Sequence, residues 1–294
     1  MDPPGIVLAF PREPSARSSR GFRGGEGSGD PSPLFFWGLR YSRRLLESPK
    51  HSPAGRVLHS DERVLALWKP PGVSLKTPPS RPGEAVVRLL GSLSALDRDS
   101  YGWGELHLVH RLDIGTSGVV ILARDEDLHR ELARAFAERR VEKTYLAWVW
   151  GHPRPREGRF DAALGPDRSD RRRMKVDPQG RAAATRYRVL AAPRHVALVS
   201  LSPETGRTHQ IRVHLAAAGH PVVGDDLYGG PRHHGLHHPT LREALSPDHT
   251  LLHAWRLALP SPPLSTPLIV TAPWDEAFAS VARAAGVEVE PLLD

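Results

Sequence analysis

The chain has 294 residues, with 40 Lys and Arg against 33 Asp and Glu, and so carries a formal charge of +7 at neutral pH. It contains no cysteine, which excludes a disulfide scaffold, a thiol nucleophile and a thiolate-bound metal centre. No apolar run reaches the roughly 18 residues that a membrane-spanning helix needs. The excess of positive charge favours a polyanionic partner, of which nucleic acid is the common one.

Residues 1–55 differ in composition from the rest of the chain, because they contain 24 Pro, Gly or Ser. Such a segment buries too little apolar surface to offset the entropy lost on ordering, so we expect it to be a disordered tail. It lacks the apolar core of a secretory signal, and its acidic residues (Asp2, Glu13, Glu26 and Asp30) argue against an organelle transit peptide. We therefore expect a cytoplasmic protein with one folded domain at residues 56–294, and organelle targeting is the alternative.

The first half of that domain shows strand signals and one strong helix signal. Short strands are predicted at residues 57–58 and 64–68 around a turn at 60–62, with a proline-terminated end at 69–72. A short helix is predicted near residues 84–93, within a loop at 76–104. An apolar run at 119–123 predicts a buried strand. Leu128, Leu132 and Phe136 then follow helical spacing, which predicts a helix over 125–140 with Asp125 or Asp127 as its N-cap.

The second half alternates short strands with turns. Strands are predicted at residues 143–150, 186–190 and 196–201, and helices at 208–218 and 276–285, the first ending at Gly219. Many strands with few helices indicate an α+β fold. We expect a mostly antiparallel mixed β-sheet core with flanking helices and loops.

The densest group of reactive side chains is the segment of residues 110–118, which reads His-Arg-Leu-Asp-Ile-Gly-Thr-Ser-Gly. Asp113 is presented there by a turn of small residues, and Arg111 lies two positions before it. Adjacent cations favour the ionised form of a carboxylate, so this arrangement is suited to catalysis. The alternative is an aspartate that only accepts hydrogen bonds from turn amides.

Two further segments carry polar side chains in suggestive positions. Residues 205–214 place two Arg, two His and Gln210 at the start of a predicted helix, where free amides favour anions. The alternative is a solvated helix face. Lys143 and Tyr145 alternate along a predicted strand and so share one face, although a lone strand tyrosine is more often part of the core.

Taken together, these segments resemble the RluA-type pseudouridine synthases. The family pattern around its catalytic aspartate, H-R-L-D-x-x-T-S-G, is matched at residues 110–118. The family's Lys-x-Tyr strand appears at 143–145 and its G-R-T-H-Q-I-R helix at 206–212. A G-H-P, G-D and Y-G series follows at 219–229, and an L-H-A at 252–254. One departure is Trp68, which stands where the family usually has Asn before Lys-Pro and is expected to alter strand packing.

The resemblance implies an RNA pseudouridine synthase that detaches uracil from its ribose at N1 and rejoins it through C5. The motif match makes Asp113 the essential carboxylate, acting either as a nucleophile at C1′ or on a C2′ proton through a glycal. Arg212 is implied as the ion-pair partner of Asp113, and Tyr145 as the side chain against the uracil ring. Such chemistry needs no cofactor and no metal, and it requires the target uridine to be flipped out of its stack.

The resemblance also implies contacts with the substrate RNA. Arg111 is expected either to fill the space that the flipped nucleotide leaves or to contact the backbone of that nucleotide. Arg207 is expected either to contact phosphate or to support the residues that touch the substrate. The substrate-binding residues expected from the motifs are His110, Arg111, Thr116, Lys143, Arg207, His209 and Gln210. Ribosomal RNA is the expected substrate and transfer RNA the alternative, with the protein acting as a monomer away from any membrane.

Two segments lie outside these motifs. Residues 168–188 hold eight Lys or Arg, including Arg171–Arg173, and are either an RNA-facing strip or a solvated charge run. Four histidines at positions 233–238 could bind a metal, but a solvated or RNA-facing loop is favoured. A competing function is an RNA-binding or RNA-folding protein in which catalysis is dispensable.

Overall fold

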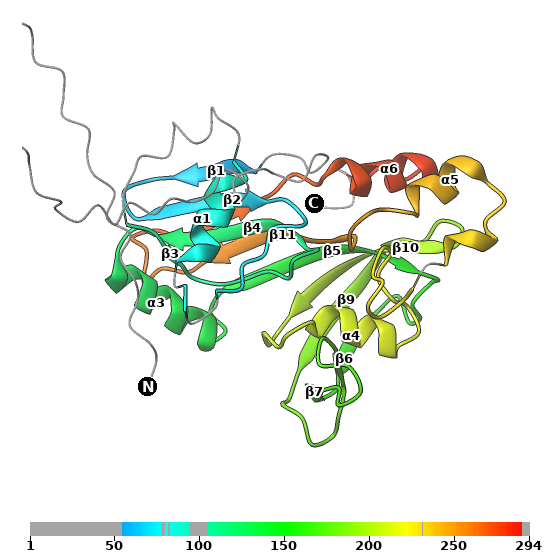
Figure 1. Cartoon of the computed structure of the whole chain (residues 1–294), viewed down its shortest axis with the longest axis horizontal. Coiled ribbons are helices and arrows are strands. Elements are labelled where there is room, and N and C mark those ends of the chain that lie inside the picture. The colour runs from blue at the N-terminus through cyan, green and yellow to red at the C-terminus, as the bar shows by residue number, and fades with distance from the viewer. Residues whose placement is uncertain (1–54, 78–79, 82, 94–104, 231, 290–294) are drawn as a thin grey trace, which may run out of the picture.

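The computed structural model describes residues 55–77, 80–81, 83–93, 105–230 and 232–289. The tail predicted to be disordered lies outside these ranges apart from Gly55. Within them the protein is built around one long mixed sheet of ten strands with a few short helices on both faces (Figure 1). This is the predicted α+β fold.

The sheet has a single parallel pair at its centre. Its strand order is β1 (Arg56–Ser60), β2 (Val64–Lys69), β4 (Ser117–Ala123), β11 (Leu252–Leu259), β5 (Glu142–Trp150), β10 (Val196–Pro203), β9 (Ala184–Ala191) and β6 (Glu157–Asp161). The short strand β3 (His107–Leu108) pairs with β4, and β12 (Leu268–Thr271) with β11. The β4–β11 pairing is parallel, and the other pairings in the described ranges are antiparallel.

Helices cover both faces of the sheet, which explains why its strands read as continuous apolar runs. The helices are α1 (Glu84–Gly91), α3 (Glu126–Ala137), α4 (Gln210–Ala217), α5 (Pro239–Ala244) and α6 (Glu276–Ala285). In one half of the sheet, Leu65 and Val120 pack with α1, whereas Val64 and Ile121 pack with α3. In the other half, α4 packs with Val149 and α6 packs with Trp148.

A small two-stranded ribbon of β7 (Leu164–Pro166) and β8 (Met174–Val176) projects from the α4 side (Figure 1). The sequence did not predict β3, β6, β7, β8 and α5. These elements have two to six residues each, too few to show apolar alternation or helical spacing.

Two predicted helices are shorter than expected, and backbone conformation explains both differences. Asp125 is the N-cap of α3, and its carboxylate accepts a 2.6 Å hydrogen bond from the Leu128 N–H. The helix stops at Ala137 because Arg139 adopts a left-handed φ of 62°. Likewise α4 begins at Gln210 instead of residue 208, since His209 has φ 55° and cannot continue the helix backward.

The parallel contact between β4 and β11 depends on Gly118. This residue has φ +121° and lies opposite Ala254, and a Cβ added to it would lie 2.3 Å from the Ala254 carbonyl oxygen. Only glycine permits both the conformation and the close approach. The strand that follows the Asp113 turn is thereby fixed against the centre of the sheet.

We predict that Gly118→Ala lowers the free energy of unfolding by at least about 2 kcal/mol, because backbone strain and a backbone clash add together. Urea unfolding measures the change. The matched control is Gly235→Ala, since no atom lies within 4 Å of a Cβ at Gly235. Equal stability of the two variants would contradict the role given to Gly118.

Candidate active site

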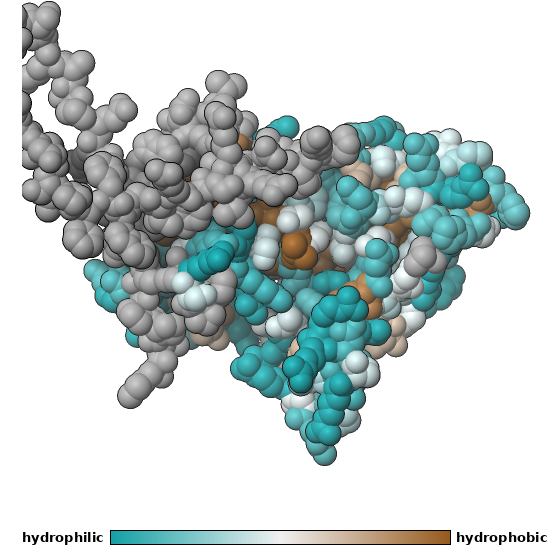
Figure 2. Space-filling model, in the orientation of Figure 1, coloured by the Kyte–Doolittle hydropathy of each residue, from teal (hydrophilic) through white to brown (hydrophobic). Residues whose placement is uncertain are grey.

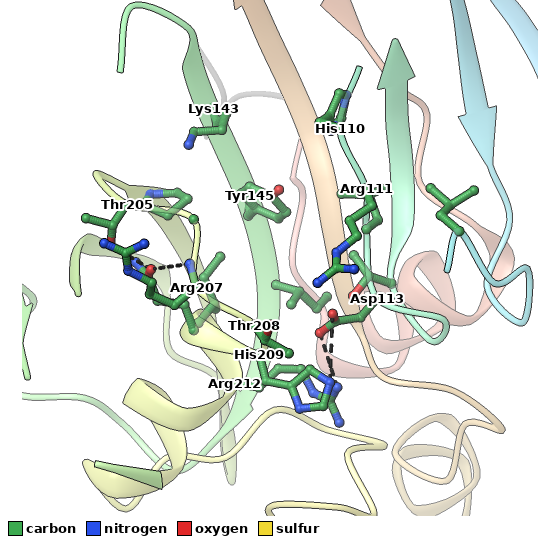
Figure 3. Close-up of a pocket in the computed structure, with 18 of the residues that line it drawn as sticks. His110, Arg111, Asp113, Lys143, Tyr145, Thr205, Arg207, Thr208, His209 and Arg212 are labelled. Carbon is green, nitrogen blue, oxygen red and sulfur yellow. Dashed lines mark hydrogen bonds and ion pairs between the residues drawn. The ribbon is translucent and has the colours of Figure 1, made fainter. Parts of the chain in front are cut away.

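The segments singled out by the sequence meet at one cavity of about 590 Å³ between the two halves of the sheet. Its walls come from residues 110–116 before β4, the end of α3 with the start of β5, and the turn before α4. Asp113 and Arg111 lie on one side, and Lys143 and Arg207 lie on the opposite side (Figure 3). Residues far apart in sequence therefore face a common space.

Asp113 stands on a turn that is held at several backbone positions. The Thr116 N–H donates to the Asp113 carbonyl at 3.1 Å. The carbonyl of Ile114 accepts from the Gly72 N–H at 2.7 Å and from Lys69 Nζ at 3.2 Å. The Asp113 side chain remains 27% exposed toward the cavity. The turn thus presents an accessible carboxylate on a fixed backbone.

Arg212 from α4 joins two carboxylates. Its Nη1 lies 3.2 Å from Asp113 Oδ2, which is the ion pair that the resemblance implies. Its Nε and Nη2 donate to the two oxygens of Asp225 at 2.7 and 2.8 Å. Burial opposes the guanidinium charge, but the two carboxylates raise the pKa of Arg212 above its ordinary value. The side chain is therefore a fixed cation whose remaining nitrogen faces Asp113.

Asp225 is completely buried and also accepts hydrogen bonds from the Leu227 and Tyr228 N–H groups at 3.2 Å. These donors hold the carboxylate in place under the guanidinium. The Tyr228 ring lies against the same guanidinium, with the Arg212 Cζ 5.1 Å from the ring centroid. Arg212 is consequently fixed by contacts on its edge and on its face.

His209 connects Tyr228 to the Asp113 side of the cavity. Its Nδ1 lies 2.8 Å from the Tyr228 hydroxyl, and its Nε2 lies 3.9 Å from Asp113 Oδ1. The Met174 N–H donates to the Tyr228 hydroxyl, so that hydroxyl can donate to Nδ1 and leave the Nε2 proton facing Asp113. Burial, opposed by the Asp113 charge, lowers the pKa of His209 and favours the neutral ring.

Tyr145 and His110 form the deeper wall of the cavity. Burial, with the charge of Asp113, raises the pKa of Tyr145, so its hydroxyl stays protonated at neutral pH. His110 Nε2 accepts a 3.1 Å hydrogen bond from the Ile121 N–H, and its ring stacks on Phe136. Burial and then the charge of Lys143 lower the pKa of His110 to about 3. His110 is thus a neutral ring that ties the Asp113 segment to β4.

Gln210 does not have the role expected for a substrate-binding side chain. Its Oε1 accepts from the Thr205 hydroxyl and the Arg207 N–H at 2.6 and 3.0 Å. Its Nε2 donates to the Ala184 carbonyl and the Thr185 hydroxyl, both at 2.9 Å. These four bonds use the full capacity of the carboxamide. Gln210 therefore anchors the turn that carries Arg207 and also occupies the helix start where an anion was expected.

The remaining expected residues divide between the cavity and the interior. Arg111 is exposed, and its guanidinium projects beside Asp113 in Figure 3. Thr116 is 2% exposed and acts through its backbone hydrogen bond to Asp113. Lys143 is half-buried on the opposite wall of the cavity. Arg207 lies on the same wall, and its Nε donates to the Ala182 carbonyl at 3.1 Å.

Sequence reasoning missed Asp225, Tyr228 and Lys69 as parts of the site. The first two were visible as the G-D and Y-G pairs of the resemblance, but nothing local ties them to Arg212. Lys69 was interpreted as the end of a hairpin. Its side chain is fully buried, and burial, opposed by the charge of Asp113, lowers the pKa of Lys69 to about 7.

The basic segment at residues 168–188 and the histidine loop at 233–238 make local side-chain contacts. Arg172 pairs with Asp170 at 2.7 Å, and the Arg173 Cζ lies 5.4 Å from the Tyr228 ring centroid. His238 accepts from the Leu241 N–H as the N-cap of α5. Across the part of the chain that the structure describes, no group of three or more His, Cys, Asp or Glu side chains could hold a metal. None of the described helices is long and apolar enough to cross a membrane.

Comparisons with known proteins point to one family. A family model described as RNA pseudouridylate synthase matches residues 63–217. The chain is 36% identical over 230 residues to the dual-specificity RNA pseudouridine synthase RluA of Escherichia coli, covering 78% of this chain and 97% of that protein. It is 38% identical over 206 residues to an uncharacterized RNA pseudouridine synthase of Mycobacterium bovis, covering 70% of this chain and 65% of that protein.

Solved structures give the same result. Human RNA pseudouridylate synthase domain containing 4 is similar with a TM-score of 0.63 and 28% identity, covering 79% of this chain and 94% of that one. Human RNA pseudouridylate synthase domain containing 1 is similar with a TM-score of 0.58 and 27% identity, covering 75% of this chain and 83% of that one.

The geometry around Arg212 leads to a prediction about stability. We expect Asp225→Asn to lower the free energy of unfolding by about 3 kcal/mol, since it leaves part of a buried guanidinium without its counter-charge. Asp113→Asn should cost less than about 1 kcal/mol, because Asp113 is partly exposed and its pairing is screened by water. Urea unfolding of both variants at neutral pH checks the order. The reverse order would contradict the assignment of Asp225 as the buried anchor.

Proposed function

As a member of the RNA pseudouridylate synthase family the chain is an RNA pseudouridine synthase, and we propose that Asp113 is the carboxylate on which its reaction depends. The observation that carries this proposal is the accessible Asp113 side chain in the cavity, 3.2 Å from the buried Arg212 guanidinium. The motif match supports the same residue. The reaction isomerises uridine within an RNA chain.

The chemistry explains why a carboxylate is needed. The N1–C1′ bond of uridine must break and a C5–C1′ bond must form, while C5 loses a proton and N1 gains one. Breaking a glycosidic bond places positive charge on the sugar, and an adjacent carboxylate stabilises that charge or attacks the carbon. Both possible routes, attack on C1′ and removal of the C2′ proton, use the carboxylate of Asp113.

Arg212 supports that role by fixing the direction of Asp113. A guanidinium beside a carboxylate forms a charge-assisted hydrogen bond with it and limits its rotation. Because Asp225 holds the other nitrogens of Arg212, the ion pair does not depend on the substrate for its geometry. Preorganisation of this kind reduces the rearrangement that must accompany bond breaking.

Tyr145 supplies the wall for the uracil ring and a hydroxyl near the proton that must move. Since the pKa of Tyr145 is raised, its side chain is a neutral hydroxyl and not a phenolate before the reaction begins. It can accept the C5 proton only if its own proton is transferred, finally to N1, which is the atom that must gain one. We assign Tyr145 to base positioning and to the final proton transfer.

The surrounding residues support RNA binding. Arg111 is exposed beside Asp113 and suited to take the place of the flipped nucleotide, while Lys143, Arg207 and His209 line the cavity. We propose ribosomal or transfer RNA as the substrate and a cytoplasmic monomer as the working form, with no cofactor. The E. coli relative is named a dual-specificity enzyme, which supports more than one RNA target.

The competing hypothesis is that RNA binding or folding assistance is what the cell requires, and that catalysis is dispensable. Both hypotheses use the same RNA-binding residues. Complementation of a deletion strain by Asp113→Asn separates them, because only the competing hypothesis predicts full rescue of growth by the variant.

We predict that Asp113→Asn abolishes pseudouridine formation while the protein stays folded and still binds RNA, since the amide carries no negative charge. Pseudouridine-specific chemical mapping of RNA from the complemented deletion strain measures the product. The control is Asp127→Asn on α3, whose side chain is 80% exposed. Full product from Asp113→Asn would refute the mechanism.

We predict that Tyr145→Phe lowers kcat about 100-fold with little change in KM, because the ring remains but the proton relay is lost. Tritium release from RNA labelled at uridine C5 gives both constants. Tyr187→Phe is the matched control, since its hydroxyl contacts the Pro155 carbonyl outside the cavity. An unchanged kcat would restrict Tyr145 to packing against the base.

A further inference from the structure

The cavity that holds Asp113 has an excess of positive charge. Its described lining includes two carboxylates, Asp113 and Glu204. Both are already paired, the first with Arg212 and the second with Arg159 and Arg186. Cationic side chains of the same lining are Lys76, Arg111, Arg139, Lys143, Arg207 and Arg212. The other cationic side chains of the lining therefore have no carboxylate within the cavity that is free to pair with them.

Part of this charge is gathered opposite Asp113. Arg139 comes from the turn after α3, Lys143 from the start of β5 and Arg207 from the turn before α4. Figure 3 shows Lys143 and Arg207 on the wall across from Asp113. Arg181 lies outside the cavity lining but near this group, because its charge acts on Arg207 and the carbonyl of the adjacent Ala182 accepts the Arg207 Nε hydrogen bond. We call these four side chains the cationic wall.

The members of the cationic wall repel one another. Burial and then the charges of Arg181 and Arg139 lower the pKa of Arg207, and burial and then Arg139 lower the pKa of Lys143. Among the described residues, none of the four lies within 4.0 Å of a carboxylate. Some surface arginines elsewhere do have a carboxylate partner, as Arg130, Arg140, Arg172 and Arg283 show, whereas here four neighbouring cations share none.

Local structure explains part of this arrangement. The left-handed φ of 62° at Arg139 belongs to the C-cap of α3, in which the Arg140 N–H donates to the Ala135 carbonyl at 2.9 Å. The position of Arg207 is not favoured by its helix, because Arg207 precedes the N-terminus of α4, where the helix dipole disfavours a cation. Mutual repulsion of these cations without a counter-charge indicates that an anionic ligand supplies one.

We propose that Arg139, Lys143, Arg181 and Arg207 form a phosphate-binding subsite that holds the RNA backbone next to the isomerised uridine. The proposal rests on the proposed function for the identity of the RNA. A uridine that enters the cavity brings its flanking phosphates with it, and the wall opposite Asp113 carries the uncompensated charge that would bind them. Guanidinium groups bind phosphate through paired hydrogen bonds, which would fix the backbone without reading its sequence.

The test measures binding of a fluorescein-labelled RNA stem-loop with uridines in its loop, by anisotropy across a KCl series. We expect Arg139→Gln and Arg181→Gln each to raise Kd several-fold at low salt. The slope of log Kd against log KCl should also fall by roughly 0.7 for each phosphate that the variant no longer neutralises. A purely structural role would not change this slope.

The matched control is Arg134→Gln on the exposed face of α3, outside the cavity lining, which should leave Kd and slope unchanged. Slopes equal to that of the wild type for both Arg139→Gln and Arg181→Gln would overturn the proposal. Because binding needs no turnover, this result is independent of whether Asp113→Asn still forms pseudouridine. Failure of the subsite and failure of the catalytic assignment are therefore distinguishable.

Discussion

The site depends on one buried cation shared by two carboxylates. Arg212 is held by Asp225 through two hydrogen bonds and offers its remaining nitrogen to Asp113. Asp225 is fully buried and Asp113 is partly exposed, so the same guanidinium has a structural partner and a reactive partner. The buried pair fixes the cation before substrate arrives. Asp113 consequently has a defined direction in a cavity that must admit a whole nucleotide.

The sheet brings the partners of that interaction together. Asp113 precedes β4, which is fixed to β11 by the close approach at Gly118, and Arg212 belongs to α4, which packs on the β5–β10 half. The cavity therefore lies where the two halves of the sheet meet, with Asp113 on one side and Lys143 and Arg207 on the other (Figure 3). In Figure 2 hydrophilic residues cover much of the projecting lower part of this face, as expected for a solvent-exposed surface.

The sequence was most informative where one local signal determined the result. The spacing of Leu128 and Leu132 predicted α3, and the motif match predicted that Arg212 pairs with Asp113. It failed where long-range contacts decide. Nothing near Gln210 in sequence indicates that its Nε2 donates to β9, and nothing near Asp225 indicates a buried guanidinium. Arg139 and His209 adopt left-handed backbone conformations, which end α3 and set the start of α4. Neither residue is a glycine, so the sequence does not mark these positions.

The most direct test of the shared-cation account is the single-turnover rate of Arg212→Lys. A lysine keeps the positive charge but cannot bind Asp225 through two nitrogens and still reach Asp113. The account predicts a rate about 100-fold lower, as small misplacements of a reacting group cause, with Kd for RNA near that of the wild type. A rate equal to that of the wild type, in a variant that folds and binds RNA, would show that charge alone suffices and would contradict the account.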